Sequence, residues 1–477
     1  MPGGTGPPTR QGVVISRSLR HAGAAPVTRI TLPSSLVIAA LSRALDLAEG
    51  VPQGHALRTC WIGMALAEAL ELPAPVRHDL YYSLLLKDAG CSATAARVTQ
   101  WLGADDRAAK RALKTSRWSS GRHAVWDTLA QARPDATLPA RAWQWARLGR
   151  RSTEVSRELA EVRCARGAET VRHLGWTDPA AEAVLMLDEH WDGSGAPMGL
   201  RGETIPLLSR LTLLAQTVEL FWQAGGPAAA RTAAQRRRGK WLDPELVDVL
   251  LAISRPADFW ANLATIDGPG AVSPLDPYPV QIDGHSPEVL LRVARVFAGV
   301  VDAKSPWTSH HSSRTAAYAR ACARVMGYAP ARRDRLTVAA LLHDIGTLGV
   351  SNLILDKPGR LTAVETDSMR AHTTLTHQIL APLSPLVDIA DLASAHHERL
   401  DGTGYHRGLR GVALTEECTV LAVADVFGAV TSARPHRAAM TPEQALDLMA
   451  PEVGQGLGVE AYEALCTVVA AGGPAFT

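Results

Sequence analysis

Seven side chains in the C-terminal half of the sequence are of the types that bind metal ions. In chain order they are His311, His343, Asp344, His372, His396, His397 and Asp425. Five imidazoles and two carboxylates without a thiolate form a nitrogen and oxygen ligand set, which suits Fe or Mn, with Zn also open. A carboxylate such as Asp344 can bridge two ions roughly 3.5 to 4 Å apart, and such a pair can acidify a water and hold a phosphoryl oxygen. The expected chemistry is attack of hydroxide on phosphorus.

The residues around these side chains predict that helices carry them inward. Residues 336–342 are apolar on nearly all sides, so they predict a buried helix that ends at His343 and Asp344. Burying an unpaired carboxylate costs several kcal/mol, so Asp344 needs a cation or strong donors there. Asp425 lies in another short apolar run and has the same need. A single inward histidine such as His311 is more often a hydrogen-bonded core residue than a ligand, so the prediction rests on the complete set.

Two further helices are predicted to carry the other histidines. Thr362 and Glu365 have the spacing of a capping box, which predicts the start of the helix that contains His372. We expect His396 and His397 to lie side by side on another helix, where neighbouring side chains diverge by about 100°. Two neighbouring ions fit this divergence better than one ion.

Length and composition predict a soluble protein of two domains. The chain has 477 residues, which exceeds one core of ordinary size, so we expect two domains of about 200 residues each. Its net charge of +2 argues neither for nor against nucleic acid as a partner. No stretch approaches the roughly 18 apolar residues that a membrane helix needs, so no membrane partner is expected. The six cysteines are scattered and no secretory signal is present, which predicts reduced thiols in a cytoplasmic protein.

The two halves of the chain share an internal repeat. LLLKDAG, which ends at Gly90, matches ALLHDIG, which ends at Gly346, and a later block around Asp192 matches one around Asp401. The offset between the copies changes from 256 to 209, so the first copy carries about 47 extra residues. A repeat of this length predicts one ancestral helical domain used twice.

The repeat and the helical periodicity together predict an all-α fold with two tandem helical domains. The predicted segments are a disordered tail at 1–33, a first domain at 34–264 with an insertion at about 100–151, a linker rich in Pro and Gly at 265–284, and a second domain at 285–477.

Three long motifs of the second half, HDIGTLGVSNLILDKPGRLT, HHERLDGTGYHRGL and VLAVADVFGAVTSARPHR, resemble the HD-GYP domain, a branch of the HD metal-dependent phosphohydrolases. The resemblance is close over about residues 285–470 and degraded over residues 36–262. It implies an all-helical domain in which two divalent metal ions, Fe or Mn, hydrolyse cyclic di-GMP to pGpG or GMP. It further implies that all seven residues named above are metal ligands, with His343 and Asp344 catalytic, and that Arg434 and Arg437 hold substrate phosphates, which suits guanidinium donors.

The sequence departs from the family pattern at several positions. Thr347 and Gly428 stand where the family has a lysine and an aspartate, which are thought to act as a pair near the scissile phosphate. The GYP signature reads GYH at 404–406, and Trp307 stands where members with three metals have a glutamate, so two metals are expected. Two alternatives therefore stay open beside the phosphodiesterase. They are a non-catalytic regulator that binds metal and nucleotide, and an HD phosphohydrolase of another nucleotide phosphoester.

The first copy has lost most of the ligand set. Aligned with the ligand positions of the second copy are His55, Lys87, Asp88, Cys164, Leu187, Asp188 and Thr217. Lys87 replaces the first histidine of the HD motif and can pair with Asp88, which would hold the fold without an ion. We expect this half to be non-catalytic and to serve dimerisation, ligand sensing or regulation, so a homodimer is one expected assembly.

Two basic stretches, 107–122 and 236–240, are candidates for a nucleic-acid surface. No DNA-reading motif accompanies them, so solvated helix faces are expected and nucleic acid is not an expected partner.

Overall fold

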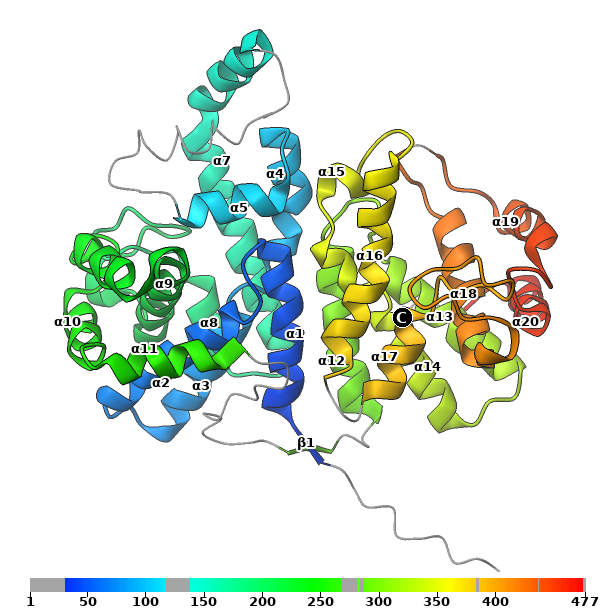
Figure 1. Cartoon of the computed structure of the whole chain (residues 1–477), viewed down its shortest axis with the longest axis horizontal. Coiled ribbons are helices and arrows are strands. Elements are labelled where there is room, and N and C mark those ends of the chain that lie inside the picture. The colour runs from blue at the N-terminus through cyan, green and yellow to red at the C-terminus, as the bar shows by residue number, and fades with distance from the viewer. Residues whose placement is uncertain are drawn as a thin grey trace, which may run out of the picture.

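The structure, a computed structural model, describes residues 31–115, 138–267, 281–283, 287–382, 386–435 and 437–474. Its helices gather into two lobes that lie side by side, one from each half of the chain (Figure 1). The first lobe contains α1 (Ser34–Glu49), α2 (His55–Ala69), α3 (Ala74–Leu86), α4 (Ala95–Leu102), α5 (Asp106–Thr115), α7 (Leu138–His173), α8 (Asp178–Leu185), α9 (Leu207–Arg237), α10 (Pro244–Ile253) and α11 (Ala257–Ala264). The second contains α12 (Pro287–Asp302), α13 (His311–Val325), α14 (Pro330–Leu342), α15 (Asn352–Leu355), α16 (Ala363–Leu380), α17 (Val387–Ser394), α18 (Glu416–Val430), α19 (Pro442–Met449) and α20 (Val459–Ala470).

The predicted all-α fold is confirmed, with one small sheet added to it. Strand β1 (Thr31–Pro33) pairs antiparallel with β2 (Gln281–Asp283), and Leu32 lies opposite Ile282. The prediction of a disordered tail is therefore wrong for residues 31–33, and the predicted linker is not irregular throughout. The rest of that tail and most of the linker lie outside the described residues.

Local sequence explains where the helices that carry the candidate ligands begin and end. The buried helix predicted at 336–342 is confirmed as the second half of α14, which has Pro330 in its first turn and ends at Leu342. The predicted capping box is also confirmed. The Thr362 backbone N–H donates to the Glu365 carboxylate at 2.7 Å, and the Glu365 N–H donates to the Thr362 hydroxyl at 3.3 Å.

Both copies have a glycine two residues after the aspartate of the motif, and a helix backbone lies directly against that glycine. A Cβ on Gly346 would overlap the carbonyl oxygen of His372 on α16, and a Cβ on Gly90 would overlap the carbonyl oxygen of Arg163 on α7. This close approach places the short 3-10 helix η4 (Ile345–Gly349) directly on α16. The HD motif and the helix that carries His372 are therefore held together by backbone contact.

Helix α5, which lies within the predicted insertion, connects the two lobes. The Arg107 guanidinium donates to the carbonyl oxygen of Gly349 at 2.5 Å and to that of Leu47 at 2.9 Å. The Asn352 backbone N–H donates to the Asp106 carboxylate at 3.0 Å. Helix α1 also packs on η4 and α16 (Figure 1). The first lobe thus touches the segment that directly follows the HD motif.

The expectation that residues 107–122 form a solvated face is wrong for the side chains that point into the protein. The Lys110 ammonium donates to the carbonyl oxygens of Ala48 and Cys91 at 3.2 and 2.9 Å. Lys114 is also turned inward, with 11% of its side chain exposed. The last part of this stretch lies outside the described residues. Lys110 and Lys114 therefore bind carbonyl and carboxylate oxygens inside the fold and do not face solvent.

The second basic stretch lies at the surface of the first lobe. Arg238 forms an exposed double ion pair with Asp248, at 2.8 and 2.6 Å. No helix in the described ranges is long and apolar enough to cross a membrane.

Lys304 is buried beside the contact between the lobes. Its ammonium donates to the carbonyl oxygen of Leu348 in η4 at 2.7 Å. Burial lowers the pKa of Lys304 to about 7, against the opposing attraction of Asp106. The folded chain therefore favours the neutral amine more than the unfolded chain does.

We predict that replacing Lys304 with Met flattens the pH dependence of stability. Because the pKa of Lys304 is about 7 in the folded chain and roughly 10.4 in the unfolded chain, raising the pH between these values favours the folded state. Wild type should gain stability over Lys304→Met across this window, by at most about 1.4 kcal/mol per pH unit. Urea unfolding at a series of pH values measures the difference. If the free energy of unfolding changed with pH equally in the two proteins, the lowered pKa of Lys304 would be contradicted.

Candidate metal centre

Five segments of the second lobe bring the seven predicted ligands together. His311 is the first residue of α13, His343 and Asp344 follow α14, His372 lies on α16, His396 and His397 follow α17, and Asp425 lies on α18. The expectation that His396 and His397 lie on a helix is wrong. Helix α17 ends at Ser394, and the pair occupies the turn that follows it.

Asp344 lies between two groups of histidines. Its Oδ2 atom is 3.4 Å from His343 Nε2 and 3.8 Å from His311 Nε2. Its Oδ1 atom is 3.4 Å from His372 Nε2 and 3.7 Å from His396 Nε2. Each carboxylate oxygen therefore faces its own pair of nitrogen ligands.

Asp425 connects the same two groups from the other side. Its Oδ1 atom is 3.0 Å from His311 Nε2 and 3.5 Å from His343 Nε2. Its Oδ2 atom is 3.9 Å from His397 Nδ1. Three groups of residues at the centre place their potential ligand atoms within 4.8 Å of one another, close enough to share a metal ion. They are His372, His396 and His397; His311, His343 and Asp425; and His343, Asp344 and His396.

Backbone carbonyls fix the orientation of three of the imidazoles. The Nδ1 atoms of His343, His372 and His396 donate to the carbonyl oxygens of Ala340, Met369 and Ala393, at 2.8, 2.6 and 2.6 Å. This bond leaves the Nε2 lone pair of each ring for the centre. His372 Nε2 and His396 Nε2 are only 3.0 Å apart, so two lone pairs face each other there. His343 Nε2 is buried and has no hydrogen-bond partner in the described part of the chain. A cation between the rings satisfies all three atoms, so the residues fit a metal centre.

Protonation preferences at the centre agree with this assignment. Burial raises the pKa of Asp344, but the surrounding imidazoles, His343 first, outweigh burial and hold that pKa well below its ordinary value. Burial lowers the pKa of His397 to about 4. Burial also lowers the pKa of His343, but Asp344 and Asp425 outweigh burial and raise this pKa to about 9. Without a metal ion the two carboxylates therefore favour a proton on His343, and a metal ion would take the place of that proton.

The predicted phosphate-binding arginines occupy the loop after α18. Arg437 donates to the carbonyl oxygens of Val430 and Ala429 at 2.9 and 3.0 Å, so part of its guanidinium closes the end of that helix. The backbones of Arg434 and Arg437 pair with each other at 2.8 and 3.1 Å. These contacts fix the loop. Phosphate binding by Arg434 and Arg437 stays a prediction.

The two departures from the family pattern lie beside the centre. The Thr347 hydroxyl donates to the Asp344 carbonyl oxygen at 2.7 Å, so it serves the local turn. A Cβ on Gly428 would lie 3.2 Å from the Thr315 hydroxyl and 3.7 Å from His311 Nδ1. Both of those polar atoms are buried without a hydrogen-bond partner among the described residues. Gly428 therefore lets α18 lie close to the Thr315 hydroxyl and the His311 ring, and offers neither of them a hydrogen-bond partner.

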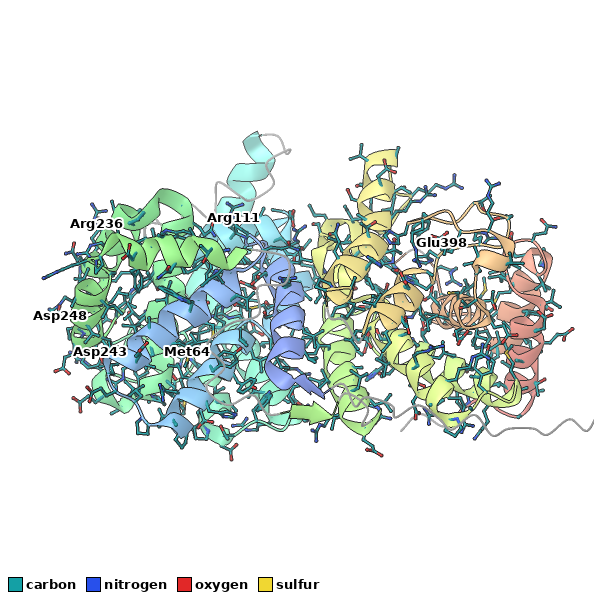
Figure 2. The ribbon with its side chains drawn as sticks, turned by 60° about the horizontal axis from the view of Figure 1, so that its bottom comes forward. Met64, Arg111, Arg236, Asp243, Asp248 and Glu398 are labelled. Carbon is teal, nitrogen blue, oxygen red and sulfur yellow. The ribbon has the colours of Figure 1, made fainter. Side chains whose placement is uncertain are left out.

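Sequence reasoning missed Glu398, which lies in the second lobe (Figure 2) and holds the loop at 407–409. Its carboxylate accepts hydrogen bonds from the backbone N–H groups of Arg407, Gly408 and Leu409, at 2.6, 3.2 and 2.9 Å. The matching Glu189 of the first copy accepts from Met198, Gly199 and Leu200, at 2.5, 3.1 and 2.8 Å. The sequence did carry a signal for this role, because both copies of the repeat have a glutamate at this position.

The first copy fills the corresponding space with cations of its own. Lys87 and Lys114 both contact the Asp88 carboxylate, the latter at 2.9 Å, and Lys114 also lies 2.5 Å from Glu49. Glu49, Asp88 and Cys91 have the spacing of a metal site, but Lys87 and Lys114 together already supply two positive charges to its two carboxylates. The lysine pairing predicted for Asp88 is present, and the insertion supplies a second lysine that the prediction lacked.

The alignment of the first copy needs two corrections. Gly90 lies against the Arg163 carbonyl as Gly346 lies against that of His372, so Arg163, and not Cys164, occupies the position of His372. The same offset of 209 residues places Gln216, and not Thr217, opposite Asp425. Arg163 forms an ion pair with Asp188. Arg163 is thus a third cation, and it lies where the second copy has the candidate ligand His372.

We predict that Lys114→Met strongly destabilises the first lobe. The change leaves the buried carboxylates of Glu49 and Asp88 short of a cation, which typically costs about 3 to 5 kcal/mol. Urea unfolding measures the loss. Arg166→Ala serves as the control because the Arg166–Glu169 pair is largely exposed, and this change should cost under about 1 kcal/mol. Equal effects of the two changes would contradict the role of Lys114.

Comparison with known proteins supports the motif analysis. The family described as the HD domain matches residues 128–246 and 295–458. The curated "3'3'-cGAMP-specific phosphodiesterase 3" of Vibrio cholerae serotype O1 is 39% identical over 92% of this chain and 95% of its own length. The "cyclic di-GMP phosphodiesterase response regulator RpfG" of Xanthomonas campestris pv. campestris is 32% identical over 39% of this chain and 48% of its own length.

Solved structures show the same relationship. The crystal structure of the cyclic GMP-AMP specific phosphodiesterase V-cGAP3 of V. cholerae is 32% identical, covers 92% of this chain and 98% of its own, and superposes with a TM-score of 0.58. The match extends over both lobes, including the copy without the ligand set. This chain belongs to the HD domain family, in its HD-GYP branch, and is a metal-dependent phosphohydrolase.

Proposed function

We propose that the second lobe hydrolyses a phosphodiester bond of the cyclic dinucleotide 3'3'-cGAMP at a centre of two divalent metal ions, with Fe or Mn the metals that suit its ligands. The observation that carries this proposal is the position of Asp344, whose two oxygens face separate pairs of imidazole nitrogens at 3.4 to 3.8 Å. A carboxylate in that position would hold two ions, one on each of its oxygens. Two such ions supply an acidified water and neutralise charge on a phosphoryl oxygen.

The ligands divide into two sets around Asp344. The first ion would take His311, His343 and Asp425 with Asp344 Oδ2, and the second would take His372, His396 and His397 with Asp344 Oδ1. The carbonyls behind His343, His372 and His396 hold these rings in the required tautomer. The protein therefore fixes the ligand atoms before an ion arrives.

Exposure indicates the side from which the substrate enters. The His343 and His396 side chains are fully buried, whereas His397 exposes 30% of its side chain and Asp344 exposes 16%. A water and a phosphodiester thus reach the centre past His397. Because the surrounding imidazoles hold the pKa of Asp344 well below its ordinary value, its carboxylate would hold the ions without first losing a proton.

The relative that spans both lobes favours 3'3'-cGAMP over the cyclic di-GMP that the motifs alone suggested. That relative covers 92% of this chain and is named for 3'3'-cGAMP, whereas the cyclic di-GMP phosphodiesterase RpfG matches 39% of it. Both substrates are rings that contain two phosphodiesters between nucleosides. We therefore propose 3'3'-cGAMP, the ring with one guanosine and one adenosine, as the substrate and keep cyclic di-GMP as the alternative substrate.

Hydrolysis of 3'3'-cGAMP, cyclic di-GMP and cyclic di-AMP by anaerobically purified full-length protein tests this function. We expect fastest turnover of 3'3'-cGAMP and about two metal ions per chain. Asp344→Ala should lose metal and lower kcat by at least about 100-fold, because removal of the bridge disrupts both ions. Asp248→Asn, which changes an exposed carboxylate of the first lobe, is the matched control and should retain both.

Faster turnover of cyclic di-GMP would transfer the proposal to that substrate. Full metal loading without turnover of any of the three would contradict it.

A further inference from the structure

We propose that Arg370, held on the face of Tyr405, binds the phosphate of the cyclic dinucleotide that is not being cleaved. This assignment rests on the proposed function and adds a substrate contact to it. The contact lies on the open side of the centre, next to His397. It would select for a ring with two phosphates over a simple phosphodiester.

Three side chains form a stack that leads outward from the centre. The Tyr405 ring lies 4.8 Å from the ring of His397, tilted by 32°. The Arg370 guanidinium carbon lies 5.1 Å from the centroid of the Tyr405 ring. A guanidinium at this distance from an aromatic face is attracted to it, so the stack restricts where Arg370 can reach. Arg370 is thereby placed one ring away from a metal ligand.

The hydrogen-bond donors of Arg370 are available to a ligand. Arg370 is exposed, and its guanidinium has no hydrogen bond or ion pair within the described residues. Two other arginines near the centre are engaged. Arg407 pairs with Asp391 at 2.7 Å, and Arg437 donates to the end of α18. An oriented guanidinium with unused donors is suited to two parallel bonds to a phosphate.

Comparison of the two copies indicates that this pair serves the substrate and not the fold. At the offset of 209 residues, Glu161 takes the place of Arg370 and Ala196 takes the place of Tyr405. The loop itself is retained, because the Glu189 carboxylate accepts three backbone N–H groups just as Glu398 does. The loop therefore folds without the pair. Arg370 and Tyr405 occur in the copy that keeps the metal ligands.

The proposed contact predicts a specific kinetic effect. The substrate has two phosphodiesters, and while the metal ions hold one, the other needs a separate cation. Arg370 would touch this second phosphate equally in the ground state and in the transition state, so its loss should raise KM and leave kcat nearly unchanged. Tyr405 acts as a positioning residue for Arg370.

The experiment compares Arg370→Ala with wild type on two substrates. We expect KM for 3'3'-cGAMP to rise about 10- to 100-fold, with kcat within about threefold of wild type. Hydrolysis of bis(p-nitrophenyl) phosphate, which has one phosphodiester, should be unchanged, as should the metal content. Tyr405→Leu should raise KM in the same direction. Arg295→Ala, which removes an exposed arginine of α12, should resemble wild type.

A double variant guards against an effect of misfolding. Arg370→Glu with Tyr405→Ala takes the residues of the first copy, whose loop keeps its hydrogen bonds. It should unfold at the same urea concentration as wild type and still show the weakest binding of 3'3'-cGAMP.

An unchanged KM in Arg370→Ala would overturn the proposal, and so would equal losses on both substrates or a loss of metal. If wild type hydrolyses no cyclic dinucleotide, the proposed function fails separately. Equilibrium binding of fluorescent 3'3'-cGAMP then decides the role of Arg370. Binding at least about tenfold weaker in Arg370→Ala would support the contact, and equal or absent binding in both proteins would overturn it.

Discussion

A buried carboxylate at the end of a buried helix is the constraint on which the rest of this structure depends. Asp344 in the second lobe and Asp88 in the first hold matching positions, and both carboxylates favour their ionised forms because neighbouring cationic groups outweigh burial. Ionised groups in such places need cations. The second lobe surrounds Asp344 with imidazoles that can hold metal ions. The first surrounds Asp88 with Lys87 and Lys114 and needs none.

This difference explains how one fold serves two purposes. The glycine after each motif and the glutamate that holds each later loop are the same in both lobes, so these scaffold contacts form with or without the seven candidate ligands. The lobes share one continuous cluster of buried apolar residues, and Arg107 of the first lobe contacts η4 directly after the HD motif of the second. The lobe without ligands thus supports the segment that bears Asp344.

Sequence was sufficient for the all-α fold and for choosing seven side chains that the structure brings to one place, because the repeat and the long motifs indicate both. Their binding of metal stays a prediction. It failed where three-dimensional packing decides. The inward direction of Lys114 depends on where α5 docks. The equivalence of Arg163 with His372 agrees with the offset of 209 residues, and the backbone contacts of both residues with the two glycines establish it. The stack of Arg370 on Tyr405 joins residues 35 positions apart. Sequence periodicity cannot predict how such a ring and guanidinium are oriented.

Anomalous diffraction at the metal absorption edge, from crystals of anaerobically purified protein, tests the central claim most directly. The account predicts two peaks about 3.5 to 4 Å apart, one on each side of the Asp344 carboxylate, and none beside Asp88, where lysines already supply the positive charge. A single peak in the second lobe, or a peak between Glu49 and Asp88, would contradict it.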